Sequence, residues 1–294
     1  MGARHALTGA MAIGALHALT PAMAAKAPEV FAPSTPWNVD YADDSCVLRR
    51  NFGTPDRKVV LELRQFVPGD VFYATIAAKF ISAGQGKLKV RFVPDTAVHE
   101  AQSAYSLVYS QGMEGVVWTD SFRPDQATVE EGPRPRWIEI ERNARESSIR
   151  GVEVSGRASP AVSLATGEMH KPMTAMRGCM DELLTHWGID AAAQRTLSRP
   201  AQPVGQANWA RVIRANYPSA MLMKMKGGIV RLRMIVSPDG KATSCHIQVP
   251  SQDPSFEKTA CAGMMKAARF DPALDASGKP IASYFAATVV YMVN

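Results

Sequence analysis

The stretch Gly228-Ile229-Val230-Arg231-Leu232-Arg233-Met234-Ile235-Val236 decides the fold of the C-terminal part of the chain. Every second residue is apolar and two arginines alternate with them, which predicts a half-buried strand. The next residues, Ser237-Pro238-Asp239-Gly240-Lys241, predict a tight turn, because proline presets φ, aspartate bonds back to the chain and glycine tolerates positive φ. A second alternating strand follows over residues 243–249. We therefore expect an antiparallel hairpin at the centre of a small domain.

Helical patterns flank this hairpin on both sides. A short one spans residues 209–215, is broken by Tyr217-Pro218, and resumes over residues 220–225. A longer one covers residues 255–268. The chain then ends on a long apolar strand, residues 281–293. This order predicts helices packed on one face of a three-stranded sheet.

Four short motifs occur in a characteristic order: Tyr217-Pro218-Ser219-Ala220, Gly228-Ile229-Val230, Ser237-Pro238-Asp239-Gly240 and Arg269-Phe270-Asp271-Pro272-Ala273. Their order and spacing resemble the C-terminal domain of TonB-type energy transducers over residues 208–294. The resemblance implies two helices and a three-stranded antiparallel sheet. It also implies a module that binds outer-membrane receptors, or other envelope partners, and passes on work derived from the inner-membrane proton gradient.

In that family the receptor segment adds a strand to the edge of the sheet. The resemblance therefore implies partner binding along the last strand and at the Tyr-Pro motif. An exposed edge offers unpaired main-chain groups, and the same edge would also allow a homodimer. The alternative is that the last strand only completes a small core. The residues expected to bind a partner are Tyr217, Pro218, Tyr284, Ala286, Thr288 and Val290, with Phe285, Ala287, Val289 and Tyr291 on the other side of the strand.

A separate β-rich domain is expected before this module, over residues 37–194. Alternating segments at 59–66, 87–93 and 136–141 predict half-buried strands, and further strands are predicted at 71–81 and 115–118. Strands at this spacing favour a sandwich or an open barrel. The final segment is a helix with an apolar stripe made by Met173, Met176, Met180, Leu183, Leu184 and Trp187. The whole chain is therefore predicted to be α+β.

The linker between the two domains is predicted at residues 195–207. Two prolines, Pro200 and Pro203, and few apolar residues indicate a segment that does not pack. Fully extended, it reaches about 40 Å. The transducers of the family carry a long spacer at this place, whereas this chain carries a folded domain.

Four cysteines are present, Cys46, Cys179, Cys245 and Cys261, without a C-x-x-C motif. Four cysteines allow three pairings. The local pairing, Cys46–Cys179 with Cys245–Cys261, keeps each bridge inside one predicted domain and is favoured. Two disulfides fit an oxidising compartment outside the cytosol.

The N-terminus predicts an export signal at residues 1–24. Arg4 and His5 precede a weakly apolar stretch, and a small-residue pattern ends at Ala24, where we expect cleavage. The alternative is an uncleaved inner-membrane anchor over residues 6–25. Only an uncleaved anchor would link the chain to an inner-membrane motor complex. An extended leader is expected at residues 25–36, and the location is predicted to be the periplasm.

Charge is concentrated at the C-terminal end. Residues 206–294 contain eleven Lys or Arg and five Asp or Glu, which gives this module a net charge of +6, the formal charge of the whole chain. Scattered cations of this kind usually form solvated faces. They are not interleaved with aromatic residues, so no nucleic acid is expected as a partner.

The sequence contains no recognisable catalytic or metal-binding motif. The glycine-lysine pair at 84–87 is expected to form a hairpin turn, and the acidic cluster at 40–44 a turn with solvated carboxylates. His99, Glu100, His170 and His186 have no partner at ligand spacing. We expect no catalytic residue, no metal and no cofactor.

A periplasmic, non-enzymatic binding protein in transport-related energy transduction is the leading hypothesis. One alternative is an enzyme or ligand sensor with its site in residues 37–194, for which the TonB-like module serves as an envelope anchor. The other is a structural adaptor that bears no force. A concave pocket with converging polar groups in the first domain would favour the enzyme or sensor.

Overall fold

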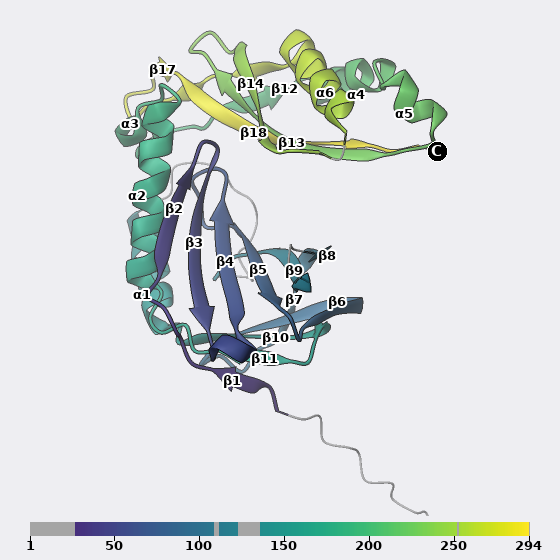
Figure 1. Ribbon diagram of the computed structural model, residues 1–294. Coiled ribbons are helices and arrows are strands. Elements are labelled where there is room, and N and C mark those ends of the chain that lie inside the picture. Colours follow the sequence, from purple (N-terminus) through teal and green to yellow (C-terminus); the bar gives the residue numbers. More distant parts are fainter. Residues whose placement is uncertain (1–26, 109–111, 123–135, 252, 294) are drawn as a thin grey trace, which may run out of the picture.

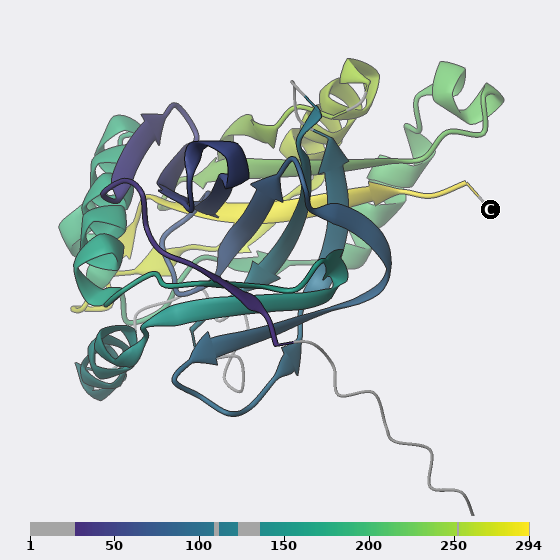
Figure 2. The same ribbon diagram turned by 60° about the horizontal axis from the view of Figure 1, so that its bottom comes forward.

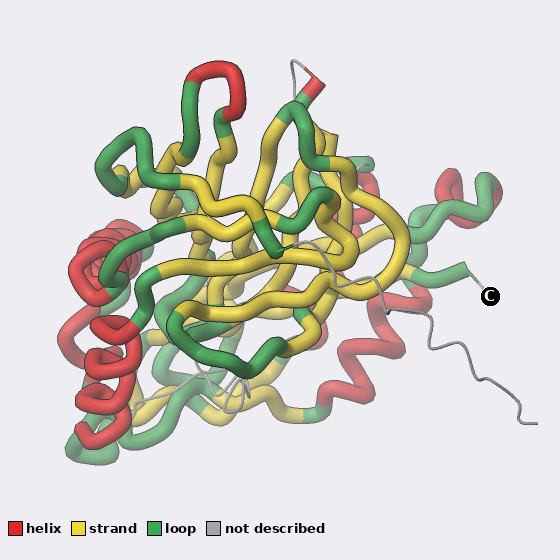
Figure 3. The backbone as a smooth tube through the Cα atoms, turned by 90° about the horizontal axis from the view of Figure 1, so that it is seen from below, coloured by secondary structure: helices red, strands yellow, loops and turns green. Residues whose placement is uncertain are grey.

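The computed structural model describes residues 27–108, 112–122, 136–251 and 253–293. Two domains follow one another along the chain, and Figure 1 shows the C-terminal domain lying across the upper ends of the N-terminal strands. Seen from below, the strands fill the middle of the molecule and the helices lie at its periphery (Figure 3). The predicted signal at residues 1–24 lies outside the described residues.

A six-stranded antiparallel sheet forms one half of the N-terminal domain. Its alternating residues are buried on the inner side, as in β4, where every second side chain is inaccessible. The order is β2-β3-β4-β5-β9-β8. The strands are β2 (Asn38–Ala42), β3 (Ser45–Phe52), β4 (Val59–Gln65), β5 (Phe72–Ala78), β8 (Gln102–Val108) and β9 (Glu114–Asp120); a 3-10 turn, η1 (Pro55–Arg57), joins β3 to β4.

A five-stranded sheet forms the other half, in the order β1-β11-β10-β6-β7. Its strands cross the lower ends of the first sheet (Figures 1 and 2). Both sheets contribute to one apolar core that also includes the predicted methionine stripe. The strands are β1 (Glu29–Phe31), β6 (Ser82–Val93), β7 (His99–Glu100), β10 (Gly151–Ser159) and β11 (Val162–Leu164).

Two predicted features of this sheet differ in the structure. The expected leader forms β1, which pairs in parallel with β11 and buries Phe31. The expected hairpin turn at 84–87 lies inside β6. Opposite this segment, Gly156 on β10 is required to be glycine, because a Cβ there would lie 2.4 Å from the carbonyl oxygen of Lys87; the pairing of β10 with β6 becomes irregular directly after it.

Three helices complete the N-terminal domain: α1 (Arg136–Ser148), α2 (His170–His186) and α3 (Ala191–Arg195). The expected strand at 136–141 is wrong, since these residues begin α1. Six alternating residues are compatible with a strand or a helix. Good helix formers follow them, and Glu139 forms an ion pair with Arg142 three residues later, so the helix is favoured. The predicted helix α2 packs against β2 and β3.

The C-terminal domain has the predicted three-stranded antiparallel sheet, in the order β14-β13-β18. Its strands are β13 (Gly228–Val236), β14 (Ala242–Val249) and β18 (Ser283–Tyr291). The helices α4 (Gln206–Ala215) and α6 (Pro254–Ala267) cover one face, and the short α5 (Ser219–Met223) lies at the far end beside the C-terminus (Figure 1). Short strands β12 (Gln202–Val204), β15 (Arg269–Asp271), β16 (Ala273–Leu274) and β17 (Pro280–Ile281) flank this core.

The segment expected to be a non-packing linker is held by the C-terminal domain. β12 pairs with β15, the amide of Leu274 donates to the carbonyl of Arg199, and Leu197 and Ala201 are buried in the second core. The segment has few apolar residues, but Leu197 and Ala201 are enough to anchor it, because main-chain pairing supplies the remaining contacts. The two domains are therefore joined without a free spacer.

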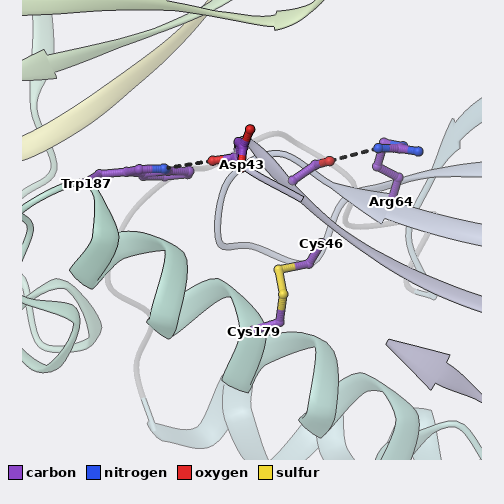
Figure 4. The surroundings of a disulfide bond; sticks show 6 residues. Asp43, Cys46, Arg64, Cys179 and Trp187 are labelled. Carbon is purple, nitrogen blue, oxygen red and sulfur yellow. Dashed lines mark hydrogen bonds between the residues drawn. A yellow bond between two sulfur atoms is a disulfide. The ribbon is translucent and has the colours of Figure 1, made fainter. Parts of the chain in front are cut away.

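Each domain contains one disulfide, in the local pairing. Cys46 on β3 bonds Cys179 on α2, and Cys245 on β14 bonds Cys261 on α6. Figure 4 shows the first bridge joining the helix to the sheet that it covers. Within the described ranges, no helix is both long and apolar enough to cross a membrane.

Candidate functional site

The edge of the C-terminal sheet is formed by β18. Among the described strands, β18 pairs only with β13, so its other side offers main-chain groups to a further strand. A groove of about 620 Å³ runs between this edge and α4. Its walls are Trp209, Ala210 and Ile213 on the helix and residues 285–292 on the strand. The groove is long enough to follow most of the edge strand.

Two buried hydrogen-bond donors line this groove without a partner among the described residues. They are the indole Nε1 of Trp209 and the hydroxyl of Tyr291, which belong to side chains at most 5% exposed. Burial, with a further contribution from neighbouring Tyr217, raises the pKa of Tyr291 to about 12, so its hydroxyl keeps its proton. Unpaired buried donors are costly, and the described residues supply no acceptor for these two.

The Tyr-Pro motif shapes the end of the groove. The ring of Tyr217 packs edge-on against Tyr291 at a centroid distance of 5.2 Å, and its hydroxyl donates to the carbonyl of Lys226. The carbonyl of Pro218 accepts from the amides of Met221 and Leu222 and so begins α5. Tyr217 lines the groove, whereas Pro218 fixes the turn that holds Tyr217 in place.

The two sides of β18 face different parts of the molecule. The register pairs Val289 with Val230 and Ala287 with Leu232, so the odd-numbered residues face the helices and the core. The predicted residues Tyr284, Ala286, Thr288 and Val290 share the opposite face with Arg231 and Arg233, where the N-terminal domain lies.

These four residues are not equally accessible. Tyr284 packs edge-on against Trp187 of the N-terminal domain at a centroid distance of 6.4 Å, and Ala286 is half-buried. Thr288 and Val290 are exposed. The open part of the strand is thus its second half, beyond the contact between the domains.

Arg233 makes a buried contact between the domains. Its side chain is 1% exposed, lies over the ring of Trp187 at 3.5 Å from the centroid, and pairs with the carboxylate of Asp44 at 2.8 Å. The indole of Trp187 also donates to the carbonyl of Asp43 at 3.5 Å (Figure 4). Burial lowers the pKa of Arg233, and Asp44 opposes this effect.

The acidic cluster at 40–44 was expected to be solvated, and for Asp44 this is wrong. Asp44 lies in the turn between β2 and β3, and its carboxylate pairs with Arg233 of the C-terminal sheet. This contact was not predicted from the sequence. Its signals were the aromatic ring of Trp187 directly after α2, and Arg231 and Arg233 on one face of β13.

Further contacts reinforce this interface. The guanidinium of Arg231 lies over the ring of Tyr73 at 4.6 Å, and the amide of Gln248 donates to the carbonyl of Phe66 at 3.2 Å. On the other side, Gln194 of α3 donates to the carbonyl of Ala282 and accepts from the hydroxyl of Ser283. The N-terminal domain therefore holds the start of β18 in place.

A second cavity of about 360 Å³ lies between the domains. Gln65 lines it with a side chain that is 1% exposed, and its Oε1 has no partner among the described residues while its amide donates to Gly69. Arg142, Arg177 and Arg195 also line it, each paired with a carboxylate. Ser283 and Tyr284 of the C-terminal domain line the same cleft, so polar groups from both domains converge on it.

Two of the histidines considered from the sequence, His99 and His170, have structural partners. His99 lies 3.0 Å from Asp120, which also accepts from the indole of Trp118, and His170 lies 3.3 Å from Glu146. No group of three or more His, Cys, Asp or Glu side chains able to hold a metal ion is present in the described part of the chain.

Comparison with known proteins agrees with the geometry of the C-terminal domain. No curated protein and no solved structure matches the chain. The predicted resemblance is confirmed by one match: residues 213–293, which contain the hairpin, α6 and β18, match the family described as Gram-negative bacterial TonB protein C-terminal.

Proposed function

We propose that this protein is a non-enzymatic envelope protein of the periplasm, acting in transport-related energy transduction. Its C-terminal domain binds an extended segment of an outer-membrane receptor, or of another envelope partner, as a fourth strand beside β18. Affinity then comes mainly from main-chain hydrogen bonds, and selectivity from side chains that enter the groove along α4.

One observation carries this proposal: the edge of β18 borders a groove lined by two buried donors, and neither the edge nor the donors have a partner among the residues that the structure describes. A peptide strand in the groove brings a carbonyl oxygen every few ångströms, and such oxygens are suitable acceptors for Trp209 Nε1 and the Tyr291 hydroxyl. The family match over residues 213–293 supports the same reading.

Photocrosslinking in cells tests this proposal directly. A photoreactive amino acid at Thr288, exposed on β18, is expected to capture the extended segment of an outer-membrane receptor, identified by mass spectrometry. The same residue at Thr243, exposed on β14, is the matched control and is expected to capture none. Equal capture at both positions would contradict strand addition at β18.

Filling the groove gives a second test. Ala210 lines the groove and is exposed, so Ala210→Trp blocks the groove without disturbing the core. Ala207→Trp places the same ring on an exposed position of α4 outside the groove. Crosslinking from Thr288 should fall at least tenfold in the first variant and persist in the second.

The cleft between the domains favours a second candidate, a ligand sensor. Gln65 Oε1 is a buried acceptor without a partner in the described part of the chain, which suits a small polar ligand that brings a donor. Native mass spectrometry of protein isolated from periplasm tests this candidate. A small molecule released on denaturation from the wild type, but absent from Gln65→Leu, would support it, and equal recovery from both would exclude this site.

A further inference from the structure

The far end of the C-terminal domain carries a group of exposed apolar side chains. Leu222, Met223 and Met225 are 48%, 80% and 67% exposed, and they alternate with Lys224 and Lys226. We call these five residues the α5 tip. Figure 1 shows α5 projecting at the end of the molecule, beside the C-terminus and away from the N-terminal domain.

The apolar surface continues onto the adjoining ends of the sheet. Ile229 at the start of β13 lies opposite Val290 near the end of β18, so both side chains point to the same face. Both are more than half exposed, as is Met292. Clusters of this kind mark interaction surfaces more often than scattered exposed residues do.

The backbone holds Met225 in a conformation that methionine rarely adopts. Its φ is 50°, and the amides of Met225 and Lys226 donate to the carbonyls of Leu222 and Met221 in the pattern of a Schellman motif. This position of the motif usually holds glycine, because a side chain there is strained. A strained and exposed methionine contributes little to folding, which points to a role in binding.

The charge around the α5 tip is positive. Lys224 and Lys226 lie within the apolar group, in a module of net charge +6. Asp253 interacts with both lysines, but its carboxylate already accepts the amide of Ser255 at the start of α6. Apolar side chains flanked by lysines match the boundary of an anionic bilayer, where methyl groups enter the acyl region and ammonium groups contact phosphates.

From this combination we propose that the α5 tip inserts into the surface of a bilayer that contains anionic phospholipid. The five residues of the tip lie outside the residues that line the groove along β18, whereas the neighbouring Val290 and Met292 line it. A protein attached in this way presents its edge strand close to the membrane that holds its partner.

Vesicle sedimentation of the full chain tests the proposal. The wild type is expected to bind vesicles of phosphatidylglycerol and phosphatidylethanolamine, and to bind phosphatidylcholine vesicles far more weakly. The triple variant Leu222→Ser, Met223→Ser, Met225→Ser should lose at least tenfold in binding. Lys224→Gln with Lys226→Gln should lose about 25-fold, about fivefold for each lysine near an anionic surface. Circular dichroism and thermal unfolding verify that each variant is folded.

Matched variants separate the tip from general surface effects. Val30, Val98 and Ile140 are exposed apolar residues of the N-terminal domain, and their triple serine variant should bind as the wild type does. Lys241→Gln with Lys279→Gln is the corresponding control for charge, since both lysines are exposed in the same domain but belong to turns outside the tip.

Insertion itself has a distinct readout. Met223→Trp should be quenched by brominated acyl chains more strongly than the tryptophans of the wild type are. Unchanged binding of the triple variant, or absence of wild-type binding, would overturn the proposal. A concentration-dependent dimer that the triple variant abolishes, without vesicle binding, would instead identify the tip as a contact between copies and would overturn it as well.

Discussion

The guanidinium of Arg233 stacks on the ring of Trp187, 3.5 Å from its centroid, and this contact joins the two domains into one body. Trp187 directly follows α2, the helix that the disulfide Cys46–Cys179 fastens to the N-terminal sheet. Arg233 lies in the central strand of the C-terminal sheet, next to the edge strand β18. Arg233 and Trp187 therefore connect the strand next to β18 with the helix that is bonded to the N-terminal sheet.

Replacing Arg233 by alanine is expected to lower the free energy of unfolding by about 2–4 kcal/mol, because the change removes the ring contact and leaves Asp44 without its partner. The loss should also separate the unfolding of the two domains into two transitions. Urea unfolding followed by tryptophan fluorescence and circular dichroism measures both effects. Arg211→Ala, at an exposed arginine of α4, should change stability by less than about 0.5 kcal/mol. A single transition of unchanged midpoint in Arg233→Ala would show that the interface contributes little.

The interface is expected to weaken in mild acid because of His246. Partial burial and the charge of neighbouring Arg233 lower the pKa of His246 from its usual 6.5, with Asp44 opposing. The unfolded state then binds more protons than the folded state, so stability falls as the pH falls from about 6.5 towards the lowered value. His246→Gln should remove this part of the pH dependence of the urea midpoint, whereas His186→Gln, at an exposed residue of α2, should retain it. If the urea midpoint of His246→Gln depends on pH as that of the wild type does, the acid sensitivity comes from another group.

The C-terminal domain could be predicted from the sequence because its signals are local. The two-residue period of β13 and the turn chemistry around Gly240 each act within a few residues, and the structure forms both as expected. The edge position of β18 came from the family resemblance and agrees with the sheet order. Local patterns of this strength leave few alternatives.

The wrong predictions of secondary structure share a physical cause: a short sequence pattern is compatible with more than one secondary structure. Alternation over residues 136–141 fits a strand, yet these residues form a helix. Glycines at 84–87 suit a turn, but they lie within β6 opposite an irregular stretch of β10. In both cases the deciding contacts come from distant parts of the chain.

The domain interface could not be predicted for a similar reason. Arg233 and Asp44 are 189 residues apart in the sequence, and neither residue is unusual in its local sequence. An arginine on an open strand face normally indicates solvent. The unpaired groove donors Trp209 and Tyr291 could not be predicted either, because only the packed structure shows that they have no partner within the described ranges.

The two disulfides are expected to differ in both accessibility and effect. Cys46 and Cys179 are fully buried and lie 133 residues apart, whereas Cys245 and Cys261 lie 16 residues apart and are partly exposed. Dithiothreitol should therefore reduce the C-terminal bridge first in the folded protein.

In the chain-entropy model, the Cys-to-Ala double variants lose free energy of unfolding: up to about 5 kcal/mol for the long loop and about 3 kcal/mol for the short one. Mass spectrometry of alkylated cysteines and urea unfolding measure these effects. Faster reduction of the N-terminal bridge would contradict the order of accessibility.

Two glycines are expected to respond to alanine in opposite directions. Gly240 has a φ of 76°, and a Cβ there would lie 2.1 Å from the carbonyl oxygen of Phe270, so Gly240→Ala should cost about 2 kcal/mol or more and weaken the central hairpin. Gly178 lies inside α2 with open space around its Cβ position, so Gly178→Ala should stabilise by about 0.5–1 kcal/mol. Urea unfolding of both variants measures the difference in stability. Crosslinking from Thr288 should fall only in Gly240→Ala, because that variant alone disturbs the sheet to which β18 belongs. A neutral Gly240→Ala would show that the turn accommodates a side chain by shifting, and that β13 and β14 do not depend on its left-handed backbone.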